Sequence, residues 1–170
     1  MGLSRTSLLG LPGILALTVL ALDQASKLLV CAIWPQPGSG QLVLIPGFLR
    51  IVHWRNPGAA WGIFSDHTWM LAALSLAAAA AIAIFFRTIT EGKAILAIPF
   101  GVLLGGIIGN FIDRAFYAGG VIDFIRFEFW PAFNVADSAN CCSIAFLVAA
   151  SILSGRKAKS GNGEGNPDDR

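Results

Sequence analysis

Four long stretches without Asp, Glu, Lys or Arg restrict what this chain can fold into more than any other feature. They cover residues 6–22, 67–86, 94–112 and 138–155. A helix that crosses a bilayer needs about 20 such residues. The whole chain is also only 13% charged, whereas an ordinary soluble domain is about 25% charged. The sequence therefore predicts an all-α membrane protein, a four-transmembrane-helix bundle with spans at about 6–28, 67–86, 94–113 and 137–155.

The first stretch extends through Asp23 and Lys27, which are four residues apart and can pair on one helix face. A secretory signal peptide is the alternative interpretation of this stretch. It is disfavoured because no small-residue cleavage site follows and three more spans come later.

Short strands are expected outside the bundle. Residues 42–55 are apolar, β-branched in places and interrupted by Pro46-Gly47, and residues 124–130 alternate between two faces. Trp54 and Trp61 suit the interfacial aromatic belt of a membrane. We expect a small extramembrane β element attached to a single membrane domain, residues 1–155, and a disordered tail, residues 156–170, rich in Gly, Asn, Lys and Asp.

The basic residues of the loops predict the orientation of the chain. Arg5, the 87–93 turn and the basic residues after 155 would lie on one side of the membrane. We therefore expect both termini in the cytoplasm and the β element on the periplasmic side. In the third span, Gly101, Gly105 and Gly109 follow the small-xxx-small pattern, which indicates close packing between helices.

Asp123 and Asp137 are the most informative polar residues. Asp137 opens an apolar run, where an ionised carboxylate costs roughly 2.5–3.5 kcal/mol at the centre of a membrane helix and less near the interface. If the two carboxylates meet, they could share a proton and activate water. A structural alternative for Asp137 is that it serves as a negative charge at the N-terminus of the fourth helix.

Other polar residues lie near these acids in the sequence. Asn110, Asp113 and Arg114 share a face of the third span, where Asp113 could simply satisfy the helix end. For Arg114, binding and structural roles remain equally open. Asn56 lies in a Pro/Gly turn and could hydrogen-bond an extended peptide, and Asn134 stands three residues before Asp137.

Several kinds of site are disfavoured by the residues themselves. His53 and His67 are fourteen residues apart and have no metal-ligand spacing, so no metal is expected. The serines lack a positioned histidine base, and no basic cluster suggests nucleic acid. Cys31, Cys141 and Cys142 are expected to be small buried residues, not a disulfide framework.

Five sequence blocks together resemble the lipoprotein signal peptidase family, also called signal peptidase II. In chain order they are Asp23–Lys27, Asn56–Trp61, Gly105–Arg114, Val121–Phe124 and Trp130–Ser138. The resemblance spans about residues 5–155, and its departures are mild: Trp61 stands where Phe is common, and Ile107-Ile108 replaces Ala-Leu.

This resemblance implies a bacterial inner-membrane aspartyl endopeptidase that cleaves prolipoproteins before the diacylglyceryl-modified cysteine. Asp123 and Asp137 match the catalytic aspartates. Asn56, Asn110, Arg114 and Asn134 match substrate-binding positions, and Asp23, with Lys27 and Asp113, is expected to give polar support. The implied partners are prolipoproteins, membrane lipid and globomycin-type inhibitors, with no cofactor and an active site near the outer leaflet.

Two other functions fit the apolar spans and acids. A small transporter or channel could use intramembrane acids to move protons or ions, although the chain shows no internal repeat of the kind many transporters have. A non-catalytic membrane assembly factor is the other alternative.

Overall fold

Four long helices form the body of the protein. The computed structural model describes residues 7–59, 63–90, 94–117 and 119–161, and within these ranges the helices are α1 (Ser7–Ile33), α2 (Thr68–Thr90), α3 (Ala94–Phe116) and α4 (Val135–Gly161). A short 3-10 helix, η2 (Ser65–His67), precedes α2. Four helical segments are long and apolar enough to cross a membrane: Gly10–Ile33, Ser65–Phe86 (which begins in η2 and continues through α2), Ile95–Phe116 and Val135–Ser154. The predicted four-span bundle is confirmed.

The helix ends differ from the predicted span limits. α1 continues to Ile33 and ends directly before Trp34-Pro35, because a residue that precedes proline disfavours the helical conformation. α4 extends to Gly161, through a segment containing the good helix formers Arg156, Lys157 and Ala158. Residues 162–170 of the expected disordered tail lie outside the described residues, as do Trp61 and residues 91–93 of the predicted cytoplasmic turn.

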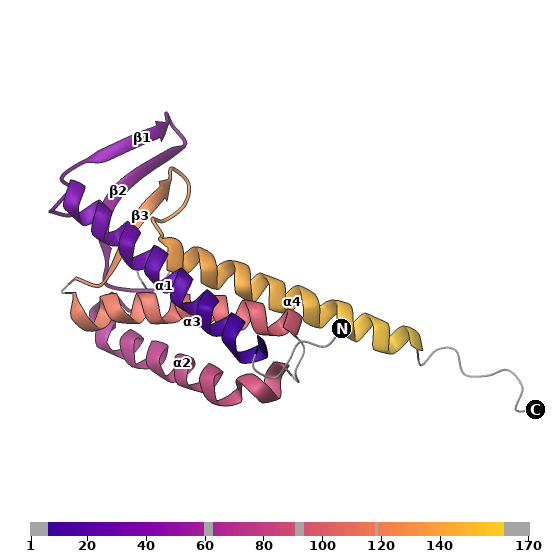
Figure 1. The fold of residues 1–170 in the computed structure, drawn as a ribbon. Helices are drawn as coiled ribbons and strands as arrows, with labels where there is room; N and C mark the ends of the chain where they lie inside the picture. The colour runs from indigo at the N-terminus through magenta and orange to yellow at the C-terminus, as the bar shows by residue number, and fades with distance from the viewer. Residues whose placement is uncertain (1–6, 60–62, 91–93, 118, 162–170) are drawn as a thin grey trace, which may run out of the picture.

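The helices run alternately up and down the bundle, as Figure 1 shows. α3 is central and packs against α1, α2 and α4. The sheet lies at one end of the bundle, and the first turn of α1 and the last turn of α4 lie at the opposite end. The connections that carry the predicted polar residues therefore gather at the sheet end.

A small antiparallel sheet confirms the predicted β element. Its order is β1-β2-β3, with β1 spanning Gln41–Ile45, β2 Leu49–Asn56 and β3 Val121–Phe127. Pro46-Gly47 forms the predicted break between β1 and β2, and Gly47 has the positive φ of 70° that glycine adopts easily.

The predicted range of the third strand, 124–130, is wrong at both ends. β3 begins at Val121, which pairs with Asn56, and it ends at Phe127. The chain then turns, and the Trp130 amide donates to the Phe127 carbonyl at 3.3 Å. Gly120, with a φ of 89°, lies so close to Asn56 that an added Cβ would overlap its backbone carbonyl. Because Gly120 lies this close to Asn56, the pairing of β3 with β2 begins three residues earlier than the alternation predicted. Asp123 is therefore part of the strand.

The glycines of α3 confirm the predicted close packing. A Cβ added at Gly105 would lie 2.5 Å from the Ala16 carbonyl of α1, and one at Gly109 would lie 2.5 Å from an oxygen of Asp23. The largest fully buried side chains are Lys27, Ile122, His53, Asn134, Asp23, Asp113 and Asp123. All of these side chains except Ile122 are polar. Hydrogen bonds and ion pairs therefore hold together the part of the interior that these residues form.

Candidate active site

The first turn of α4 is closed by two reciprocal hydrogen bonds. The Asn134 side chain accepts from the Asp137 amide at 2.9 Å, and the Asp137 carboxylate accepts from the Asn134 amide at 3.2 Å. This is the pattern of a capping box, in which the residue before the helix and the third helical residue satisfy each other's backbone. The structural alternative for Asp137, a negative charge at a helix N-terminus, therefore describes part of what this residue does.

Asn134 links Asp137 to Asp123. While its side-chain oxygen caps α4, its Nδ2 donates to Asp123 Oδ1 at 2.8 Å. The second oxygen of Asp123 accepts from Asn56 Nδ2 at 3.0 Å. Asn56 is itself fixed, because its Oδ1 accepts from the Gly58 amide at 3.1 Å within the predicted Pro/Gly turn. Residues from β2, β3 and the start of α4 thus meet at one carboxylate.

Asn110 of α3 makes hydrogen bonds with both Asp137 and Asn134. Its Nδ2 donates to Asp137 Oδ1 at 2.7 Å, and its Oδ1 accepts from Asn134 Nδ2 at 3.2 Å. Both carboxylates are therefore hydrogen-bonded on both oxygens by described groups. The predicted set of Asn56, Asn110 and Asn134 converges on the two aspartates.

Lys27, Asp23 and Asp113 form a buried ion-pair cluster that contacts Asn110. Lys27 Nζ is 2.7 Å from Asp23 Oδ2, 2.9 Å from Asp113 Oδ2 and 3.2 Å from Asn110 Oδ1. An ammonium has three protons to donate, and here each has an acceptor. Lys27 therefore orients the Asn110 amide, because it leaves that amide's nitrogen to face Asp137.

The two acids of this cluster join distant elements. Asp23 Oδ1 accepts from the Ala136 amide of α4 at 2.9 Å, and Asp113 Oδ2 accepts from the Ile122 amide of β3 at 3.0 Å. Gln24 donates to both carboxylates at 3.1 Å. Asp113 is not the locally satisfied helix end that its position suggested, because it faces α1 and β3 instead of Arg114.

Arg114 points toward the turn after β2. One guanidinium nitrogen donates to the Gly58 carbonyl at 3.2 Å, and another makes a long contact of 3.4 Å with the Asn110 carbonyl. Its Nε is buried without a partner among the described residues.

The environment of Asp123 favours its protonated form. Its side chain is 1% exposed. Burial raises the pKa of Asp123 from its ordinary value of 3.8 to about 7, and the charge of Asp137 acts in the same direction. The hydrogen bonds from Asn56 and Asn134 and the charge of Lys27 oppose this rise without cancelling it. Asp123 therefore changes charge near neutral pH.

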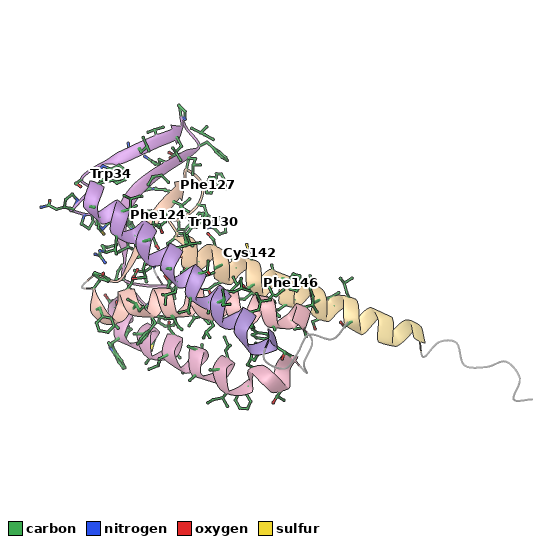
Figure 2. All side chains as sticks on the ribbon, in the orientation of Figure 1. Trp34, Phe124, Phe127, Trp130, Cys142 and Phe146 are labelled. Atoms are coloured by element: carbon green, nitrogen blue, oxygen red, sulfur yellow. The ribbon has the colours of Figure 1, made fainter. Side chains whose placement is uncertain are left out.

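A cavity of about 890 Å³ opens beside these groups. Asp123, Asp137, Asn56, Asn110 and Arg114 line its polar part, whereas α2, α4 and the segment after β3 supply mostly apolar walls. Figure 2 shows Phe127 and Trp130 between the sheet and the beginning of α4, with Cys142 further along that helix. The cavity can therefore receive a long apolar molecule that presents one polar group to the aspartates.

The expectation of buried cysteines is wrong for two of them. Cys141 and Cys142 are exposed and line the cavity, and Cys31 is half-buried. Sequence reasoning also missed two polar residues. Gln24 could have been found beside Asp23 in the first block, and Asn140 could have been found as an amide within an apolar span.

Comparison with known proteins shows which solved structures and which family this chain is similar to. A solved structure described as a bacterial membrane enzyme determined by the in meso method at 2.3 Å resolution superimposes with a TM-score of 0.79. It is 27% identical over 95% of each chain. A second, described in the same words at 1.9 Å resolution, has a TM-score of 0.73 and 31% identity over 83% of this chain and 92% of its own. Residues 15–153 match the family model described as signal peptidase (SPase) II. The match contains both aspartates, the three asparagines, the Lys27 cluster, the second and third spans and most of the first and fourth, and on this basis the chain belongs to the signal peptidase II family.

Proposed function

We propose that this protein is an aspartic endopeptidase that cleaves prolipoproteins before the diacylglyceryl-modified cysteine, with Asp123 and Asp137 as its catalytic residues. As a member of the signal peptidase II family it is a multi-pass membrane peptidase that removes lipoprotein signal peptides. The observation that carries the aspartic mechanism is the direct link through Asn134, which hydrogen-bonds both carboxylates at the polar end of the apolar cavity.

The two aspartates would have different roles. Asp123, whose pKa is raised to about 7, would hold the proton and polarise the scissile carbonyl. Asp137 accepts hydrogen bonds on both oxygens at the start of a helix, where a negative charge is stabilised, so it would be ionised and take a proton from water. Water would then attack the carbonyl, and the tetrahedral species would collapse as a proton passes to the leaving amine. No covalent intermediate with the enzyme is required.

The other polar residues would position the substrate. Asn56 and Arg114 line the cavity beside Asp123 and would hydrogen-bond the extended peptide around the scissile bond. Asn110 and Asn134 would hold the two carboxylates in place. The apolar walls would take the acyl chains of the lipidated cysteine, and globomycin-type inhibitors would occupy the same cavity.

We further propose that the protein lies in the bacterial inner membrane with both termini in the cytoplasm and the site near the outer leaflet. The support is the bias of Lys and Arg in the loops, together with the position of the sheet opposite the first turn of α1 and the last turn of α4. A transporter is less favoured than a peptidase. Asp23, Asp113, Asp123 and Asp137 belong to one connected group of contacts through Lys27, Asn110 and Asn134 and do not form a path through the bundle.

The test is cleavage of a diacylglyceryl-modified prolipoprotein by the purified protein in detergent, in the presence of a chelator. Wild type is compared with Asp123→Asn and Asp137→Asn. We expect cleavage before the modified cysteine by wild type and at least a 1,000-fold lower rate, roughly 4 kcal/mol of lost transition-state stabilisation, in each folded variant. Turnover retained by either variant would rule out the two-aspartate mechanism. If folded wild type fails on the lipidated substrate, ion flux in liposomes without peptide tests the transporter instead.

A further inference from the structure

Two arginines lie opposite each other on the small sheet. Arg50 of β2 and Arg126 of β3 are partners in the antiparallel ladder. Their side chains therefore share a face of the sheet, with Cβ atoms about 5 Å apart, where like charges are destabilising. Among the described residues, the acid that pairs with this couple is Glu128, whose carboxylate is 2.8 Å from Arg50. One of the two positive charges is thus left without a counterion in the described part of the chain.

The guanidinium of Arg126 is free to donate. It makes no hydrogen bond or ion pair with any residue that the structure describes. Its nitrogens are also accessible, because none of them is among the buried unpartnered atoms of the described residues. Arg50 uses one nitrogen for Gln41 Oε1 at 3.1 Å and another for Glu128. A guanidinium has five N–H donors in a planar fork that fits a phosphate group, so Arg126 can hold such an anion.

The two arginines lie on the face of the sheet that is turned away from the cavity. Asp123 and Phe127 of β3 line the cavity, and successive side chains of a strand point to opposite faces. Arg126, which directly precedes Phe127, therefore points to the other face. Neither Arg50 nor Arg126 is among the residues that line the cavity. An anion bound between them would be separate from the two aspartates.

The surface beside the arginines is apolar. Every residue of β1 is exposed, and Val43 of this strand is the ladder partner of Arg50. Figure 1 shows β1 at the outer edge of the sheet. An exposed apolar edge strand promotes aggregation in water, but it suits the interface of the membrane that the four helices can cross. The exposed large hydrophobic residues of β1 and of the turn after it are Leu42, Val43, Leu44, Ile45 and Phe48.

A phospholipid has the chemistry that this surface would recognise. Its phosphodiester group carries a negative charge that complements the unpaired charge of Arg126, and arginines near a membrane surface attract anionic lipids. Its acyl chains complement the apolar residues of β1, which are next to Arg50 in the sheet. A free phosphate ion would satisfy the arginine but would not cover the apolar strand. The lipid is therefore the better match.

We propose that Arg50 and Arg126 bind the phosphate group of a phospholipid whose acyl chains cover the exposed residues of β1. The bound lipid holds the sheet at the level of the headgroups, beside the end of the bundle. This inference does not rest on the proposed function, because the two arginines contact neither aspartate. It is therefore tested by lipid binding and not by peptide cleavage.

The experiment titrates dioleoylphosphatidylglycerol into the purified protein in a neutral detergent and counts bound lipid by native mass spectrometry. Arg126→Gln removes the free guanidinium. Arg55→Gln is the matched control, because Arg55 is also on β2 but is already engaged: it donates to the Gly120 carbonyl at 3.2 Å and lies 5.2 Å from the centre of the Tyr117 ring. Dioleoylglycerol, which has the same chains without phosphate, and inorganic phosphate alone are the two other probes.

We expect Arg126→Gln to raise the Kd for the phospholipid about fivefold, the effect of one arginine near a membrane surface, and Arg55→Gln to leave it unchanged. Glu128→Gln should lower the Kd, because it frees Arg50 for the phosphate. Dioleoylglycerol and inorganic phosphate should each bind more weakly than the phospholipid. An unchanged Kd in folded Arg126→Gln, or an equal loss in Arg55→Gln, overturns the proposal. Equal binding of dioleoylglycerol, or of inorganic phosphate, overturns it as well.

Thermal unfolding checks that the change in binding is not a change in folding. Without lipid, Arg126→Gln removes a like-charge pair, so its melting temperature should equal or exceed that of wild type. With saturating phosphatidylglycerol, wild type should gain more stability than the variant, because it binds the lipid more tightly. A melting temperature of Arg126→Gln below that of wild type without lipid would show that the protein itself supplies a partner for Arg126, and this would overturn the proposal.

Discussion

Lys27 shows how a single buried charge can organise a site that it does not line. It forms ion pairs with both Asp23 and Asp113 and also orients Asn110, whose amide donates to Asp137. The exposed fractions of the Lys27 and Asp23 side chains are 1% and 0%. Removing one partner of such a buried pair leaves a charge that water cannot reach.

We therefore expect Lys27→Met to be severely destabilising. It leaves Asp23 and Asp113 unpaired in the interior, at a cost of about 3–5 kcal/mol. Arg50→Met is the matched control, since Arg50 pairs with Glu128 at 2.8 Å where both side chains are accessible, and an exposed pair contributes about 1 kcal/mol or less. Equal effects of the two changes on the free energy of unfolding in detergent would contradict the organising role of Lys27.

The protonation of Asp123 predicts how activity depends on pH. In the proposed mechanism Asp123 must hold a proton, and its pKa is about 7. We expect kcat/KM to fall as pH rises through about 7, by nearly tenfold per pH unit once Asp123 is mostly ionised. A pH–rate profile with lipidated substrate measures this, and constant activity up to pH 9 would show that the proton is not needed there.

Stability gives an independent measure of the same pKa. Because the folded-state pKa is raised from 3.8 to about 7, the folded state binds more protons than the unfolded state between these values. Stability contributed by protonated Asp123 is thus complete below pH 3.8 and is lost as pH rises to about 7, at up to about 1.4 kcal/mol per pH unit. The melting temperature of wild type minus that of Asp123→Asn should fall across this window and level off above it.

At the scale of elements, the contact between α1 and α3 brings the two halves of the site together. It sets Asp23 and Lys27 of α1 beside Asn110 and Asp113 of α3. The helices can approach this closely because the α3 glycines face the backbone and small residues of α1.

Gly105→Ala is therefore expected to separate α1 from α3. The new Cβ would meet the Ala16 carbonyl at 2.5 Å, so the helices must move apart, at a cost of about 1–3 kcal/mol. Gly13→Ala on α1 is the control, because a Cβ there meets no atom within 4 Å and alanine is favoured over glycine in a helix by up to about 1 kcal/mol. Melting temperatures that fall for Gly105→Ala and hold or rise for Gly13→Ala would support this packing. Unchanged stability of Gly105→Ala would contradict it.

The third strand of the sheet shows that the alternation of neighbouring residues can predict a strand without predicting where it begins. The alternation of residues 124–130 correctly predicted a strand but misplaced it, since pairing with β2 begins at Val121. The cause is the close approach of Gly120 to Asn56. That approach depends on a strand some 65 residues earlier in the chain, because Arg55 donates to the Gly120 carbonyl.

At the scale of the whole molecule, the alternating helices put the sheet and the two described chain ends at opposite ends of the bundle. If the site faces the periplasm, both termini face the cytoplasm. We expect a fluorescent protein fused to the C-terminus to fluoresce in the cytoplasm, and alkaline phosphatase inserted after Gly47 in the β1–β2 turn to be active in the periplasm. The reverse pair of results would invert the proposed orientation.

The sequence by itself determined the four spans, the presence of a small sheet and the family, because hydropathy, turn residues and sequence blocks are properties of contiguous residues. It also singled out Asp123, Asp137 and the three asparagines, which occur in these blocks. Tertiary structure decided what each polar group contacts. Asp113 faces Lys27, not Arg114, and Asn134 joins the two aspartates. These outcomes depend on contacts between residues far apart in the chain, such as Asp23 and Ala136. In the interior of a membrane bundle such contacts decide whether a polar side chain is satisfied, because water is absent there.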